Sequence, residues 1–123
     1  MSDNTVTLIG NTTRDVELSF GGNSGSAIAS FGIAINNRKK DANGEWIDGD
    51  AQFYDVKAFG SIAENIAESV TKGTRVIVNG RLNFQQWEDK NDGSKRSKVE
   101  VIADSVGVEL RWATAQVTKI SKT

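Results

Sequence analysis

Strand-like runs, several of which alternate apolar and polar residues with a period of two, recur along this 123-residue chain. This pattern is typical of strands that bury one face. Five such runs predict strands at 5–9, 27–35, 51–59, 74–87 and 98–106. One helix is expected between the third and fourth runs, because Ser61-Ile62-Ala63-Glu64 has the form of a capping box and an apolar stripe follows it. Gly73 is the expected stop of that helix.

Turn signals divide the predicted strands into pairs. Asn43-Gly44 and Asp92-Gly93 predict type I′ turns, so the second and third strands, and the fourth and fifth, should form extended hairpins. Asn79-Gly80 is compatible with a third turn or with a bulge that bends one long strand. Five strands with one short helix between the third and fourth predict an all-β fold, a five-stranded OB-fold barrel.

Composition removes the commonest catalytic tools. The chain has no cysteine, histidine or proline, which excludes thiolate chemistry, the usual general base and the usual zinc ligands. We therefore expect no cofactor, no metal and no enzymatic activity. No signal peptide or membrane span is recognisable, so a cytoplasmic protein without a membrane partner is expected.

The charge is unevenly distributed along the chain. The formal net charge is −1, but residues 1–70 carry five basic and ten acidic side chains, whereas residues 71–123 carry ten basic and six acidic. A nearly neutral total argues against a simple basic nucleic-acid binder. The second half of the chain can still present a basic groove.

The third predicted strand has two unlike faces. Tyr54, Val56 and Ala58 form a face that suits the core, and the opposite face carries Phe53, Asp55, Lys57 and Phe59. Aromatic rings interleaved with a cation are suited to stacking on bases and contacting phosphates. The structural alternative is that this face packs under a loop or another subunit, with Lys57 extending to solvent.

The fourth predicted strand favours the functional interpretation. If it runs straight, Phe84 points inward with the valines of the strand, and Arg75, Arg81 and Trp87 point outward with three amide side chains. Such a face is a plausible groove for a single nucleic-acid strand. The alternative for Trp87 is a hydrophobic lid at the base of the following loop.

Basic residues also occur in both hairpins. Arg38-Lys39-Lys40 enters one turn, and Lys95-Arg96 with Lys98 leaves the other. An isolated basic triplet is usually a solvated turn, but two on one barrel favour strand binding between the loops. The candidate nucleic-acid-binding residues are Arg38, Lys39, Phe53, Lys57, Phe59, Lys72, Arg75, Arg81, Trp87 and Arg96.

From about Asn4 to Ala115, the chain resembles bacterial single-stranded-DNA-binding proteins. The stretches that carry the resemblance are VTLIGNTTRDVEL, SFGIAINNR, FYDVKAFGSIAENIAESVTKG and RVIVNGRLNFQQWED, and the ending DSVGVELRWATAQV is similar to actinobacterial members. The resemblance implies one continuous bent strand through Asn79-Gly80, and base stacking on Phe53, Phe59 and Trp87. It also implies a homotetramer, with residues 1–107 as the OB-fold domain and residues 108–123 as an extension strand that lies on a neighbouring subunit.

The chain departs from the family pattern at several positions. Arg38-Lys39-Lys40 stands where the family has a further aromatic, Gln85 and Gln86 stand where it is often basic, and Val16 replaces a usual proline. The family's tail with an acidic, Phe-ending tip is absent from this sequence, so recruitment of partner proteins through such a tip is not expected.

Three functions remain open at this point. The leading hypothesis is sequence-independent binding and protection of single-stranded DNA in replication, recombination and repair, in the cytoplasm at the nucleoid. The alternatives are an OB-fold replication accessory that mainly contacts partner proteins, and a carboxylate-dependent OB-fold nuclease. The nuclease is disfavoured because no carboxylate cluster falls on the face that carries the arginines.

Overall fold

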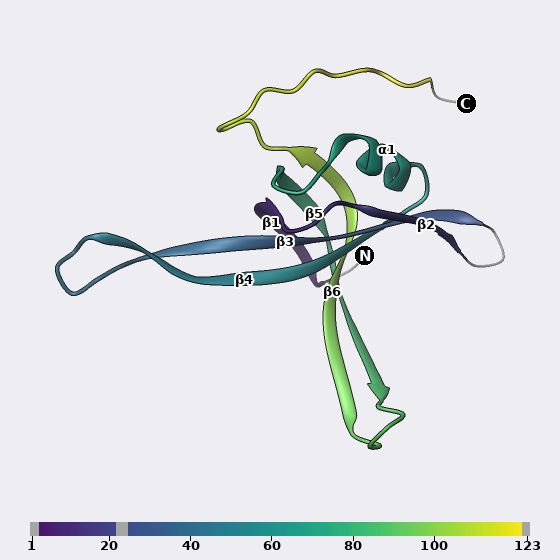
Figure 1. Cartoon of the computed structure of the whole chain (residues 1–123), viewed down its shortest axis with the longest axis horizontal. Coiled ribbons are helices and arrows are strands. Elements are labelled where there is room, and N and C mark those ends of the chain that lie inside the picture. The colour runs from purple at the N-terminus through teal and green to yellow at the C-terminus, as the bar shows by residue number, and fades with distance from the viewer. Residues whose placement is uncertain (1–2, 22–24, 122–123) are drawn as a thin grey trace.

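The computed structural model describes residues 3–21 and 25–121, and it contains six strands and one helix. Figure 1 shows a central body from which two long hairpin arms project. Within these residues, no helix has the length and apolar character needed to cross a membrane. The elements are β1 Thr5–Thr12, β2 Glu17–Gly21, β3 Ser26–Lys40, β4 Trp46–Phe59, α1 Ser61–Ser69, β5 Arg75–Glu88 and β6 Lys95–Val108.

The strands form one sheet that closes on itself. Their order is β1-β5-β6-β4-β3-β2, and β1 also pairs with β3 through Asn11 with Ala34 and Thr12 with Ile33. β4 and β6 are parallel, and every other pair is antiparallel. The helix lies between β4 and β5, which are the third and fourth of the expected strands. The predicted all-β OB architecture is therefore confirmed.

The β2 strand was not predicted. Its five residues, Glu17–Gly21, pair antiparallel with the start of β3, from Glu17 opposite Ser30 to Gly21 opposite Ser26. The segment is short and leads into Gly21-Gly22-Asn23-Ser24-Gly25-Ser26, a stretch whose composition predicts a loop between strands. Residues 22–24 of that stretch lie outside the described residues.

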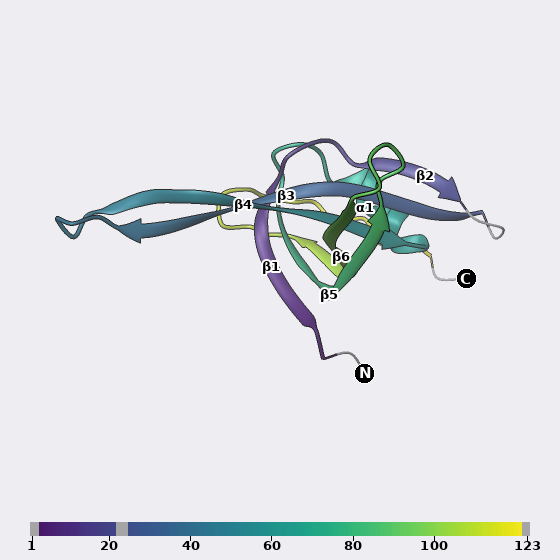
Figure 2. The ribbon, with the colours of Figure 1, turned by 90° about the horizontal axis from the view of Figure 1, so that it is seen from below.

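The alternation in β3 and β4 gives the barrel its core. α1 packs against β2, β3 and β4 and buries Ala63 and Ile66, and Figure 2 shows it beside these strands. Alternate residues of β3 and the expected inward residues of β4 are buried, and Tyr54 and Ile35 are partly buried; the fully or nearly fully buried ones are Ala27, Ala29, Phe31, Ile33, Val56 and Ala58. The largest fully buried apolar side chains are Phe31, Ile33, Val56, Val76, Val78 and Val101.

Both expected ends of the helix are corrected. The N-cap is Gly60, with φ of 89°, and Ser61 is the first helical residue without a side-chain cap hydrogen bond. The capping box is therefore wrong. The helix ends at Ser69 because Val70 turns extended and is buried, at 3% exposure. Gly73, with φ of 88°, serves the following turn, where its amide donates to the Thr12 carbonyl at 2.9 Å.

The two hairpins are confirmed, but their turns are not type I′. Among the described residues only glycines have positive φ, including Gly44 and Gly93, whereas a type I′ turn needs positive φ at both central residues. Each loop is instead longer and organised by an aspartate at its start. The Asp41 carboxylate accepts the amides of Asn43 and Glu45, each at 2.9 Å, and the Asp89 carboxylate accepts the Asn91 amide at 2.8 Å.

The β5 strand continues through Asn79-Gly80, as the resemblance implied. The irregularity is on its partner: Asn79 pairs with Ser105 and Gly80 with Ala103, which leaves Asp104 of β6 as the extra residue. A Cβ atom at Gly80 would overlap the carbonyl oxygen of Ile102. The glycine is needed for this close approach, and the alternation of β5 is preserved on both sides of it.

Candidate nucleic-acid interface

The outward sides of β4, β6 and the second half of β5 form one continuous surface. Asp55 lies beside Glu100 across the parallel β4–β6 pair. Glu100 in turn lies opposite Asn83, and Arg96 lies opposite Trp87. Because directly paired residues share a side of a sheet, these side chains lie on one surface. We call it the aromatic face, and it is made of Phe53, Asp55, Lys57, Phe59, Arg81, Asn83, Gln85, Trp87, Arg96, Lys98, Glu100 and Ile102.

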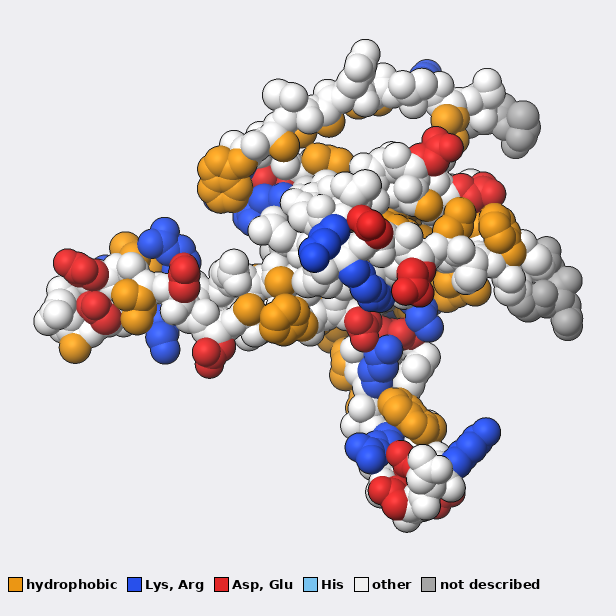
Figure 3. Space-filling view, in the orientation of Figure 1, with side chains coloured by type: hydrophobic (Ala, Val, Ile, Leu, Met, Phe, Trp, Pro, Cys, Tyr) orange, Lys and Arg blue, Asp and Glu red, His pale blue; other side chains and the backbone are white. Residues whose placement is uncertain are grey.

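The three aromatic candidates are accessible on this face. Phe53 is 71% exposed, and Phe59 and Trp87 are each 48% exposed. Phe53 and Phe59 lie on the same side of β4, with Lys57 between them in sequence. Figure 3 shows hydrophobic side chains at the surface, interspersed with charged ones, over the central body and both arms. Rings that expose about half of their area or more can stack on unpaired bases.

Most cations of the aromatic face are paired with carboxylates. Lys57 Nζ lies 3.6 Å from Glu100 Oε2, and Lys98 Nζ lies 3.1 Å from Asp55 Oδ2. Arg96 lies 3.4 Å from Asp89 and 3.9 Å from Asp92. Arg81 is exposed and makes no ion pair within residues 3–21 and 25–121. The charge of this face is therefore largely balanced by its own acidic residues.

Glu100 is a member of this face that sequence reasoning missed. It is 1% exposed. Its Oε1 accepts hydrogen bonds from Gln85 Nε2 at 3.0 Å and from Asn83 Nδ2 at 3.4 Å. A glutamate between two valines in an alternating run looks exposed in the sequence. No local signal marks it, because its contacts with Asn83 and Gln85 depend on the register of β6 against β5.

In the loop that joins β5 to β6, Ser94 stabilises the charged form of Asp92. Hydrogen bonds from Ser94 lower the pKa of Asp92 below its ordinary 3.8. The Ser94 hydroxyl donates to Asp92 Oδ1 at 2.6 Å, and the Ser94 amide donates to the same oxygen at 2.9 Å. Hydrogen bonds to the charged form stabilise it, so Asp92 remains an anionic partner for Arg96.

Arg38 and Lys39 lie on the β3–β4 arm, away from the centre of the aromatic face. Arg38 pairs with Asp48 and Lys39 with Ile47, near the tip, and Figure 1 shows this arm projecting from the body. Lys40 Nζ lies 5.3 Å from the centre of the Trp46 ring, and Trp46 is 58% exposed. The arm therefore offers a second basic and aromatic region for a strand that continues beyond the barrel.

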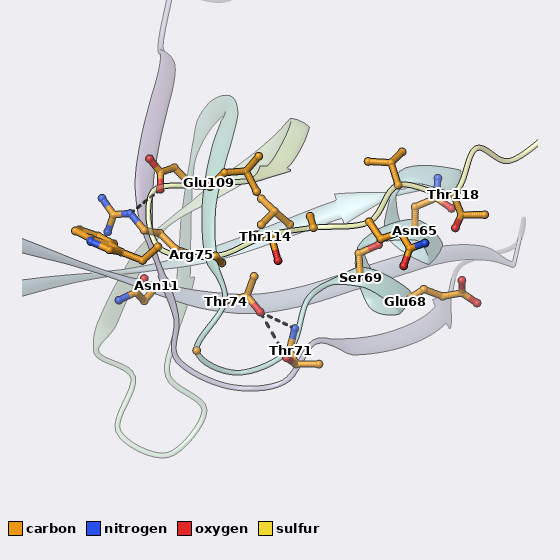
Figure 4. Close-up of a pocket in the computed structure, with 18 of the residues that line it drawn as sticks. Asn11, Asn65, Glu68, Ser69, Thr71, Thr74, Arg75, Glu109, Thr114 and Thr118 are labelled. Carbon is orange, nitrogen blue, oxygen red and sulfur yellow. Dashed lines mark hydrogen bonds and ion pairs between the residues drawn. The ribbon is translucent and has the colours of Figure 1, made fainter.

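Lys72 and Arg75 lie in a different place. Both line a cavity of about 1220 Å³ between the barrel, α1 and the chain's C-terminal segment, part of which is drawn in Figure 4. Arg75 Nε lies 3.3 Å from Glu109 Oε2, and its guanidinium lies 4.9 Å from the centre of the Trp112 ring. Six of the ten candidates therefore lie on the aromatic face. Arg38 and Lys39 lie on the β3–β4 arm, and Lys72 and Arg75 line the cavity beside the C-terminal segment.

Phe84 does not point into the core as expected. It is 60% exposed, and its cross-strand partner Val99 is 46% exposed. Alternation in β5 is intact, but beyond Leu82 the strand leaves the barrel and forms the projecting arm, so its inward side has no core to face. This apolar pair lies on the side of the arm opposite Trp87.

No group of three or more residues that could hold a metal ion occurs within the described part of the chain.

The chain is similar to known single-stranded DNA-binding proteins along most of its length. The chain is 47% identical over 121 residues to the single-stranded DNA-binding protein of Mycolicibacterium smegmatis, spanning 98% of this chain and 72% of the relative. It is 46% identical over 121 residues to that of Mycobacterium tuberculosis, spanning 98% and 73%. The crystal structure of the small single-stranded DNA-binding protein from Streptomyces coelicolor matches with a TM-score of 0.75 at 25% identity, covering 89% of this chain and 97% of that one. A model of the single-strand binding protein family matches residues 3–109, and the chain belongs to this family.

Proposed function

We propose that this chain binds and protects single-stranded DNA without sequence preference, in replication, recombination and repair at the bacterial nucleoid. The observation that carries the proposal is the exposure of Phe53, Phe59 and Trp87 on one continuous sheet face. Every base has a π-face, so stacking tolerates any sequence. The chain's role is binding, with no catalytic step and no cofactor.

Single strands should be preferred over duplex because paired bases hide the surfaces that stack. Titration with oligo-thymidine, followed by tryptophan fluorescence, tests this against a duplex of equal length. We expect much tighter binding of the single strand, and equal affinity for duplex would contradict the proposal. Incubation of labelled DNA with magnesium should leave the DNA intact, whereas fragments would support the nuclease alternative.

We also propose a homotetramer. Thr5 to Gly10 of β1 pair with β5 on one side, and within the described residues no strand pairs with their other side. The C-terminal segment 109–121 contains no strand, and its apolar residues are exposed, from 57% at Ile120 to 89% at Val117. An unpaired edge is a template for pairing with another chain, and exposed apolar patches mark interaction surfaces. Light scattering should give four times the mass of one chain, and a stable monomer at micromolar concentration would reject this assembly.

A further inference from the structure

A buried carboxylate lies at the centre of the aromatic face, where phosphates are expected to approach. The Glu100 side chain is 2% exposed, and its Oε2 lies 3.6 Å from Lys57 Nζ. Its other oxygen accepts the two amide hydrogen bonds from Asn83 and Gln85. Oε2 itself accepts no hydrogen bond within the described residues, so Lys57 is the group that neutralises this oxygen.

The burial of Glu100 decides how firmly Lys57 is held. Removing the cation would leave a buried charge without a partner, which is strongly unfavourable. The neighbouring pair of Lys98 and Asp55 differs, because both side chains are exposed, at 40% and 46%. Water can replace either partner in such a pair, and the interaction is weak. Lys98 can therefore turn to a phosphate at little cost, whereas Lys57 cannot.

We propose that Glu100 is a positioning residue that acts through Lys57. It holds the ammonium group in an ion pair on the sheet, so that Lys57 does not neutralise a DNA phosphate. Glu100 thereby limits the number of phosphates that the aromatic face engages and leaves stacking as the main contribution at its centre. This inference rests on the proposed single-strand binding.

The test is the salt dependence of oligo-thymidine binding by Glu100→Gln. The substitution removes the charge but keeps an oxygen that can accept from Asn83 and Gln85. Each phosphate neutralised on a single strand adds about −0.7 to the slope of log affinity against log salt. We expect the slope of Glu100→Gln to be steeper by about 0.7, with tighter binding at low salt. An unchanged slope in a folded variant would overturn the proposal.

Asp104→Asn is the matched control. Asp104 lies on the same strand, is exposed, and makes no ion pair among the residues described. The substitution changes the net charge by the same amount without freeing a cation, so the slope should stay at the parental value. If it steepens as much as that of Glu100→Gln, general charge and not Lys57 explains the effect, and the proposal fails.

The double variant Lys57→Gln/Glu100→Gln gives an independent test even if the single variant folds poorly. It removes both charges, so no buried charge is left unpaired. If Lys57 neutralises no phosphate in the parent, the double variant must keep the parental slope. A slope shallower by about 0.7 would mean that Lys57 already contacts phosphate, and it would overturn the inference while leaving single-strand binding intact. Absence of any oligo-thymidine binding by the parent would instead overturn the proposed function itself.

Discussion

An arginine and a tryptophan lie near each other at both ends of β5. The two ends differ in whether a cation lies over the indole ring. At the N-terminal end, Arg75 lies 4.9 Å from the Trp112 ring, and Arg111 lies 5.5 Å from it. At the C-terminal end, Trp87 lies opposite Arg96 across the β5–β6 pair, and no cation lies over its ring among the described residues. A side chain that points outward is therefore not always available to a ligand.

The chain's own C-terminal segment causes the difference. Glu109 follows directly after β6, and its carboxylate reaches Arg75 from one side and Arg111 from the other, at 3.3 and 3.7 Å. Because the Arg75 guanidinium already contacts a carboxylate and an indole, it is expected to bind a phosphate less readily. The C-terminal end of β5 lies on the projecting arm, away from this segment (Figure 1), and no cation of the described residues covers the Trp87 ring.

The largest expected effect is loss of stacking. Base–aromatic stacking contributes about 1–3 kcal/mol per base by alanine substitution. Phe53→Ala, Phe59→Ala and Trp87→Ala should therefore each weaken oligo-thymidine binding by roughly tenfold, at little cost to folding because these rings are exposed. Trp112→Ala is the control at the other end of β5 and should change the affinity far less. A folded Trp87→Ala variant that binds like the parent would leave Trp87 as a hydrophobic lid.

The two tryptophan sites should also separate by fluorescence. A base stacked on an indole quenches its emission, so Trp87→Phe should keep most of the affinity and lose most of the quenching on titration with oligo-thymidine. Trp112→Phe should retain the quenching, although it can loosen the oligomer, which light scattering would detect. If the quenching is lost in Trp112→Phe and retained in Trp87→Phe, Trp112 and not Trp87 is the tryptophan that stacks on a base.

The sequence predicted which side chains point outward, but not which of them are already paired with another residue. Period-two alternation needs only the neighbouring residues, so it correctly placed Phe53 and Phe59 outward and Val56 in the core. The occupation of Arg75 depends on Glu109, which lies 34 positions further along the chain, and the pairing of Lys57 depends on the register of β4 against β6. No local pattern contains either fact.

The remaining errors have similar physical causes. The capping box was wrong because Gly60, with its positive φ, takes the N-cap position and moves the serine inside the helix. Phe84 was assigned to the core because alternation does not show where a strand leaves the barrel. Sequence thus predicted the fold and the sides of the strands. Contacts between distant segments decided which side chains are free.

A smaller effect is expected from the two arginines of β5. Arg81 makes no ion pair in the described part of the chain, whereas Arg75 is paired with Glu109. Arg81→Gln should make the slope of log affinity against log salt shallower by about 0.7, which corresponds to one phosphate on a single strand. Arg75→Gln should leave that slope nearly unchanged. Equal changes in the two variants, measured with the same oligo-thymidine, would show that the C-terminal segment does not withdraw Arg75 from DNA.

The smallest expected effect lies at the tip beyond the C-terminal end of β5, where Asp92 helps to hold Arg96. The pKa of Asp92 is lowered, chiefly by the Ser94 hydroxyl and then by the Ser94 amide. A carboxyl whose folded pKa is depressed adds stability above its unfolded pKa, and that stability is lost as the pH falls through the folded pKa.

Ser94→Ala removes the largest cause of the lowered pKa. The pKa of Asp92 should therefore rise toward 3.8 without fully reaching it, because the backbone amide still donates. A carboxyl NMR titration measures this shift, with Ser97→Ala on the same arm as the control that leaves Asp92 unchanged. Because the Asp92 side chain is exposed to solvent, thermal stability above pH 5 should hardly change. An unaltered Asp92 titration in Ser94→Ala would show that the hydroxyl does not hold this carboxylate.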